Sequence, residues 1–94
     1  MRLSRNAQIS LDEIIEYTKN NWGKSELHGL KKRIQNLFNV LQSNPCAFKI
    51  HENNNRIRKA MLLDDISVFY EINDNTVDVL LFWHNSRNPE NLKL

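Results

Sequence analysis

Residues 56–84 have the sequence RIRKAMLLDDISVFYEINDNTVDVLLFWH. Apolar, β-branched and aromatic residues dominate three short runs, and Asp and Asn residues separate the runs. Such runs are typical of strands, and both separators have the length of hairpin turns. We therefore predict an antiparallel meander of three strands over about 56–63, 66–72 and 76–83.

Alternation along the predicted third strand assigns its side chains to two faces. One face carries Val77, Val79, Leu81 and Trp83, and the other carries Thr76, Asp78, Leu80, Phe82 and His84. Both faces are partly apolar, so we expect one of them to pack against helices. The polar segment 47–55 is ambiguous between a loop and a short strand, and residues 2–4 are a candidate for a small additional strand at the sheet edge.

The first half of the chain has the apolar spacing of helices, with repeats of three and four residues. One stripe predicts a helix over about 5–21, capped by Ser4 or starting later at a Ser10–Glu13 capping box. The second stripe runs from Leu27 to Leu41 and ends before Pro45. Because Trp22 closes the first stripe, we predict that its side chain belongs to the core, and Trp83 is assigned to the core on the same grounds.

The chain has 94 residues, which is the size of a single domain spanning 1–94. No apolar run is long enough to cross a membrane, and the first residues lack the apolar segment of a secretory signal. Cys46 has no second cysteine with which to form an internal disulfide. We therefore expect a cytoplasmic protein.

Charge is distributed unevenly, although the net charge is only +2. Nine basic and two acidic residues lie between Lys19 and Lys59. From residue 60 onward, two basic residues face six acidic ones. The middle of the chain is therefore suited to an acidic or polyanionic partner.

These elements predict an α+β fold, in which an N-terminal helical hairpin packs on a small twisted antiparallel sheet. Particular residues then point to a family. The N-terminal segments LSRNA (3–7), LDEI (11–14) and WG (22–23) resemble the first half of ParE-type toxins in the RelE/ParE superfamily. The segments RIRK (56–59), VFYEI (68–72), VLLFWH (79–84) and RNP (87–89) resemble its core strands and C-terminal tail. The resemblance covers nearly the whole chain.

Membership of this superfamily implies the toxin of a type II toxin–antitoxin system, of the kind associated with plasmid stabilization and growth inhibition. It also implies a cognate antitoxin that binds the toxin, in a hetero-oligomer, and silences it. ParE-like members inhibit DNA gyrase, and this is the target that we expect. No cofactor is expected.

RelE-like members instead cut messenger RNA on the ribosome, and candidates for that chemistry exist in this chain. His84 is suited to exchange a proton at neutral pH, while Arg58 and Arg87 are suited to hold phosphate and stabilise the transition state. Catalytic RelE-like members often carry a tyrosine near the C-terminus, but the last tyrosine here is Tyr70, which we predict to be a core residue. An inactive protein-binding module of the same fold is the third alternative.

Antitoxin or target binding is expected to involve Arg56, Arg58, Lys59 and Arg87. A charged residue such as Arg58 inside a strand is costly unless it is paired or hydrated, so a functional groove, an antitoxin carboxylate and a structural salt bridge are all open. The three histidines form no metal-ligand spacing with cysteine or carboxylate residues, and no metal site is expected.

Overall fold

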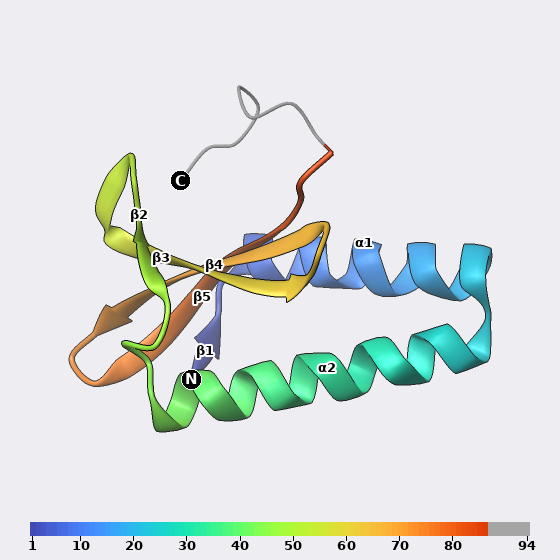
Figure 1. Ribbon diagram of the computed structural model, residues 1–94, viewed down its shortest axis with the longest axis horizontal. Helices are drawn as coiled ribbons and strands as arrows, with labels where there is room; N and C mark the ends of the chain where they lie inside the picture. The colour runs from blue at the N-terminus through green and yellow to red at the C-terminus, as the bar shows by residue number, and fades with distance from the viewer. Residues whose placement is uncertain (87–94) are drawn as a thin grey trace.

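The computed structural model describes residues 1–86. They form two helices and a five-stranded sheet, whose first strand precedes the helices and whose other four strands follow them (Figure 1). The elements in chain order are β1 (Arg2–Leu3), α1 (Arg5–Trp22), α2 (Lys24–Ser43), β2 (Lys49–His51), β3 (Asn54–Leu63), β4 (Ile66–Asn73) and β5 (Thr76–His84). The predicted helical hairpin and three-stranded meander are confirmed, and their ends agree with the predicted ends to within three residues.

The strand order across the sheet is β1-β5-β4-β3-β2. β2 to β5 are antiparallel neighbours, whereas β1 runs parallel to β5. The α+β class is confirmed, but the sheet is mixed rather than purely antiparallel. β1 leads directly into α1, and Ser4 between them donates its backbone N–H to Val79 O at 2.9 Å, which continues the pairing with β5.

The helices begin and end at residues with clear local causes. Ser4 caps α1, since its side chain accepts a hydrogen bond from the backbone N–H of Ala7. Between the helices Gly23 has φ 88°, a conformation that side chains disfavour. α2 ends before Pro45, as predicted. The β4–β5 turn has positive φ at Asp74 and Asn75, the geometry of a tight two-residue hairpin.

A β-bulge in β5 overturns the predicted assignment of its faces. Tyr70 pairs with Val79, but the preceding residue of β4, Phe69, pairs with Leu81, so that Leu80 is an extra residue. One extra residue reverses the alternation beyond it. Phe82 therefore joins Val79 in the core, and the prediction that Phe82 and His84 lie opposite Val79 is wrong.

Two serines of the α1 segment hydrogen-bond to the backbone around this bulge. Ser4 Oγ donates to Leu80 O at 2.9 Å, and Ser10 Oγ accepts from Phe82 N–H at 3.0 Å. Buried backbone groups that lack a ladder partner need such replacements. Ser10 is therefore an anchor between α1 and β5 rather than the start of the helix.

Both helices pack on the same face of the sheet, with α1 along β5 and α2 near β3. The core consists of Ala7, Leu11, Leu30, Ile34, Leu37, Leu41, Ala60, Leu62, Ile66, Val68, Tyr70, Val77, Val79 and Phe82. No residue from 17 to 29 is buried, and Figure 1 shows this end of the hairpin projecting past the sheet. We call residues 17–29 the hairpin tip.

Candidate functional site

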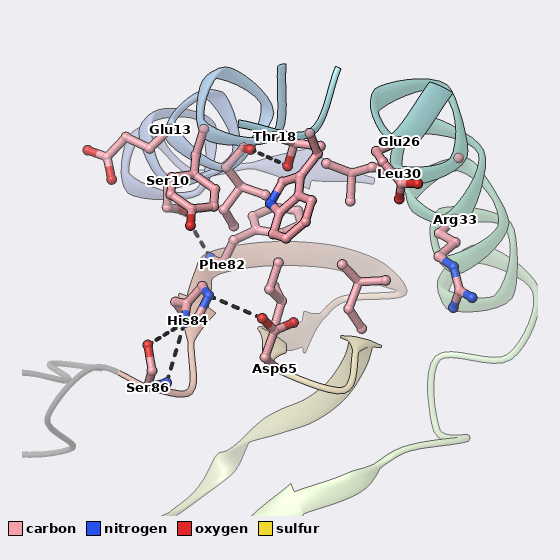
Figure 2. A pocket seen from close by; sticks show the side chains of 16 residues that line it. Ser10, Glu13, Thr18, Glu26, Leu30, Arg33, Asp65, Phe82, His84 and Ser86 are labelled. Atoms are coloured by element: carbon pink, nitrogen blue, oxygen red, sulfur yellow. Dashed lines mark hydrogen bonds and ion pairs between the residues drawn. The ribbon is translucent and has the colours of Figure 1, made fainter. Parts of the chain in front are cut away.

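A groove of about 950 Å³ lies between the helical hairpin and the end of the sheet (Figure 2). Three parts of the chain form its walls. They contribute Ser10, Glu13, Ile14, Tyr17, Thr18 and Trp22 from α1, Glu26, Gly29, Leu30 and Arg33 from α2, and Leu63, Asp65, Ile66, Phe82, His84 and Ser86 from the sheet side. The groove therefore has an apolar interior and several charged groups around it.

The groove exists because the helices are longer than the sheet that they cover. α1 has 18 residues, about 27 Å of helix, yet its buried residues are only Ala7 and Leu11. Trp22 is 66% exposed and Tyr17 is 57% exposed, so the prediction that Trp22 belongs to the core is wrong. Trp22 continues the apolar stripe, but the stripe has passed the edge of the sheet.

His84 lies on the groove side of the sheet because the bulge in β5 turned it there. Its Nε2 is 3.2 Å from Asp65 Oδ2, and its Nδ1 is 2.6 Å from Ser86 Oγ. The backbone N–H of Ser86 also donates to Nδ1, at 3.4 Å, so Nδ1 is an acceptor and the proton of the neutral ring lies on Nε2, facing Asp65. Figure 2 shows these contacts at the edge of the groove.

This arrangement orients the imidazole but occupies both of its nitrogens. An aspartate that fixes the tautomer of a histidine is a common partner of a general base. Here, however, an incoming substrate has to displace Asp65 or Ser86 before it can contact a ring nitrogen of His84. In the structure as it stands, the His84 contacts tie the β3–β4 turn to the end of β5.

Arg58 also lies on the helix-facing side of the sheet, where it pairs with Tyr70. Its guanidinium donates to Phe48 O at 2.7 Å, while Tyr70 donates its hydroxyl to Pro45 O at 2.6 Å. A structural salt bridge, one of the alternatives for Arg58, is not found among the described residues, where its guanidinium bonds to a loop carbonyl instead. Both side chains fasten the loop between α2 and β2.

Tyr70 is fully buried, which confirms its assignment to the core. Burial raises the pKa of its hydroxyl, and the positive charge of Arg58 opposes that rise. Its ring also makes an edge contact with Phe48, with 6.4 Å between ring centroids. Tyr70 is therefore a packing residue with its hydroxyl used internally.

Arg56 and Arg58 flank a cleft of about 210 Å³, completed by Asn55 and Ile72. Arg56 is exposed and Arg58 is partly exposed. Among residues 1–86 no ion pair to a carboxylate is found for either guanidinium. The cleft is thus suited to accept a carboxylate or another small anionic group.

Lys59 belongs to the opposite face of the sheet, because it pairs with Phe69, outside the helix-facing core. There it lies directly across from Lys49 of β2. Like charges in direct cross-strand positions repel each other. Because Lys59 and the two arginines lie on opposite faces of the sheet, they cannot bind one small ligand together. A long partner that passes around the edge of the sheet can reach both faces.

The residues considered for RNA cleavage do not converge within the described part of the chain. Arg58 is level with Tyr70, and His84 is level with Ile66, which precedes Tyr70 by four residues in β4. That offset is about 13 Å at the usual strand rise. Arg87 lies outside the described residues.

Residues 1–86 contain neither a metal-ligand cluster nor a membrane-spanning helix. No group of three or more His, Cys, Asp or Glu side chains in this range is placed to hold a metal ion. Neither α1 nor α2 combines the length and the apolar character that a membrane-spanning helix needs.

The groove itself was not predicted from the sequence, but one residue on its wall offered a clue. Gly29 interrupts a good helical pattern without any turn following it, and an isolated glycine in such a position often has a packing or functional reason. No comparable feature of the local sequence indicated that Trp22 is exposed.

Comparison with known proteins agrees with this architecture. A solved structure described as the chromosomal ParDE TA system from P. aeruginosa matches with a TM-score of 0.73 at 19% sequence identity, covering 88% of this chain and 91% of that one. No curated protein matches the chain. The family described as the ParE toxin of type II toxin–antitoxin system, parDE, matches residues 1–89. The chain belongs to the ParE toxin family.

Proposed function

We propose that this chain is a toxin that inhibits DNA gyrase in the cytoplasm and that a cognate antitoxin neutralises it. Membership of the ParE family supports the toxin role. The observation that favours gyrase over RNA is the state of His84, whose two ring nitrogens contact Asp65 and Ser86. A nuclease needs a base that is free to reach its substrate.

The groove is the proposed docking site of the antitoxin. Trp22 and Tyr17 present large exposed side chains there, next to buried Leu30 and Phe82. An amphipathic helix that lays its apolar face in such a groove covers surface that the toxin cannot cover itself. Aromatic side chains in this kind of position commonly dominate binding energy.

A second antitoxin contact is proposed at the cleft between Arg56 and Arg58. Acidic residues of an extended antitoxin segment fit there, because guanidinium groups bind carboxylates through paired hydrogen bonds. Lys59, on the other face, is proposed to contact the same segment only where it passes around the sheet edge. Toxin and antitoxin would then form a hetero-oligomer with contacts at two separate places.

Messenger RNA cleavage is the second candidate, with Arg58, His84 and Arg87 as its residues. The observation in its favour is that Asp65 orients the His84 ring in the way that a general base requires. In this alternative Ser86 moves away and frees Nδ1. An inactive module that only binds the antitoxin is the third candidate.

Induction of the chain alone in a bacterium tests all three proposals. Growth, integrity of messenger RNA and plasmid supercoiling are followed together, with co-expressed antitoxin as the control. Growth arrest with intact RNA and lost supercoiling or trapped gyrase–DNA complexes is the expected result. Cut RNA that becomes intact in His84→Ala would replace this proposal with the second candidate, and normal growth would leave only a binding role.

A further inference from the structure

Gly29 lies in the first half of α2, on the wall of the groove. A glycine inside a helix destabilises it relative to alanine, because the glycine backbone loses more freedom on folding. A Cβ atom built on Gly29 would meet no atom within 4 Å among those considered. The packing of the described chain therefore does not require glycine at this position. Its backbone conformation does not require glycine either, because of the two glycines only Gly23 has a positive φ.

Two residues of opposite charge flank Gly29 on the same side of α2. Glu26 precedes it by three residues and Arg33 follows it by four, which is the spacing of a single helix face, and all three line the groove. Glu26 and Arg33 are both exposed. They are about 10 Å apart along the helix axis, too far to neutralise each other.

We propose that Gly29 is the point of closest approach between α2 and a helix of the antitoxin docked in the groove, and that Glu26 and Arg33 set the direction of that helix. This inference rests on the antitoxin docking proposed above. The distance between two packed helices depends on the side chains at their contact, and a glycine permits the shortest distance. A glycine with no internal purpose is explained by a close external neighbour.

The charges specify the chemistry of the partner helix. It carries a basic residue facing Glu26 and an acidic residue facing Arg33, about two turns apart, with a small or flat apolar surface between them. The reversed orientation would bring like charges together at both places, which disfavours it. The groove therefore selects one direction of the bound helix.

The test compares Gly29→Ala and Gly29→Gln with the wild-type chain. Melting temperature is measured on each free chain, and affinity is measured by calorimetry with the full-length protein encoded by the neighbouring reading frame. Both variants should keep or raise the melting temperature, by about 4 °C for Gly29→Ala. Affinity should fall with side-chain size, by about tenfold or more for Gly29→Gln, since its side chain occupies the space of the bound helix.

His28→Gln is the matched control, because His28 is exposed on the same turn but does not line the groove. It should leave affinity unchanged. If the wild-type chain binds and Gly29→Gln binds equally well, the inference about Gly29 fails while the proposed function stands. If the wild-type chain does not bind the neighbouring protein, the proposed function fails first. Loss of a dimer of this chain in Gly29→Gln, with antitoxin affinity unchanged, would identify a second copy as the occupant and overturn the proposal.

Discussion

The two ends of the helical hairpin carry the same kind of apolar stripe but have different surroundings. Where the helices cross the sheet, Leu11, Leu37 and Leu41 are buried against the strands. In the hairpin tip no residue is buried, and the apolar stripe ends at exposed Trp22. Helical spacing alone therefore does not separate a residue that builds the core from one that stays exposed.

The two parts of the hairpin are therefore suited to different roles. The covered part supplies the stability that a domain of this size needs, because apolar burial is the main favourable contribution to folding. The tip, without such burial, contributes less to folding and is available for binding. We expect substitutions in the two parts to affect different measurements.

The largest effect is expected in the covered part. Leu41 is completely buried, so Leu41→Ala removes packed atoms and leaves a cavity. Its free energy of unfolding should fall by about 2–5 kcal/mol. Urea unfolding followed by circular dichroism measures this change.

Leu27→Ala is its matched control, since it is the same substitution in the same helix but lies in the tip, where Leu27 is only partly buried. It should cost clearly less, about 1 kcal/mol. Equal losses for the two variants would mean that the tip is as well packed as the rest, and would remove the contrast.

The next effect concerns binding rather than stability. Trp22→Ala should change the free energy of unfolding by no more than about 0.5 kcal/mol, because the side chain is mostly exposed. Antitoxin binding should weaken by about 2 kcal/mol, as for an aromatic anchor at an interface. Calorimetric titration of the variant with the antitoxin measures this loss of affinity.

Ile9→Ala serves as the control for Trp22, because Ile9 is an exposed apolar residue of α1 outside the groove. Its affinity should equal that of the wild-type chain. A loss of stability in Trp22→Ala as large as that of Leu41→Ala would assign Trp22 to the core after all.

The smallest effect is a pH dependence at the other end of the molecule, where β1 meets β5. Hydrogen bonds from Arg2 and Asn73 hold the pKa of Asp78 below its usual value. With a lowered folded-state pKa, this contribution to stability is complete above the unfolded pKa of about 3.9 and is lost as the pH falls through the folded value. Between pH 6 and pH 3 the wild-type urea midpoint should fall slightly more than that of Asp78→Asn. An identical fall in both proteins would show that the contact is not part of the acid response.

The helices, the meander and the α+β class were predictable because they depend on local patterns. Ser4 and Pro45 mark helix ends through short-range hydrogen bonding and ring geometry, and these act in any surroundings. The β5 bulge was not predictable. Its extra residue is stabilised by Ser4 and Ser10, which lie more than 70 residues away in the sequence.

The candidate site was predicted less well than the fold, for the same physical reason. His84 and Arg58 were identified by residue type, but the structure places them four residues apart along β4, too far apart to act on one small group. The groove residues Trp22, Tyr17 and Gly29 were not identified as a site. The exposure of these residues depends on where the sheet ends beneath the hairpin, and no local sequence pattern shows where that is.

The sequence by itself determined the two helices and the meander, because backbone propensities, caps and apolar periodicity act over a few residues. The family followed from the resemblance of particular segments. Only the tertiary structure decided which part of the hairpin is covered and on which face His84 lies. A helix that extends past its sheet leaves part of its apolar stripe exposed, and one extra residue in β5 reverses the faces beyond it. Both outcomes arise from contacts between segments that are distant in the chain.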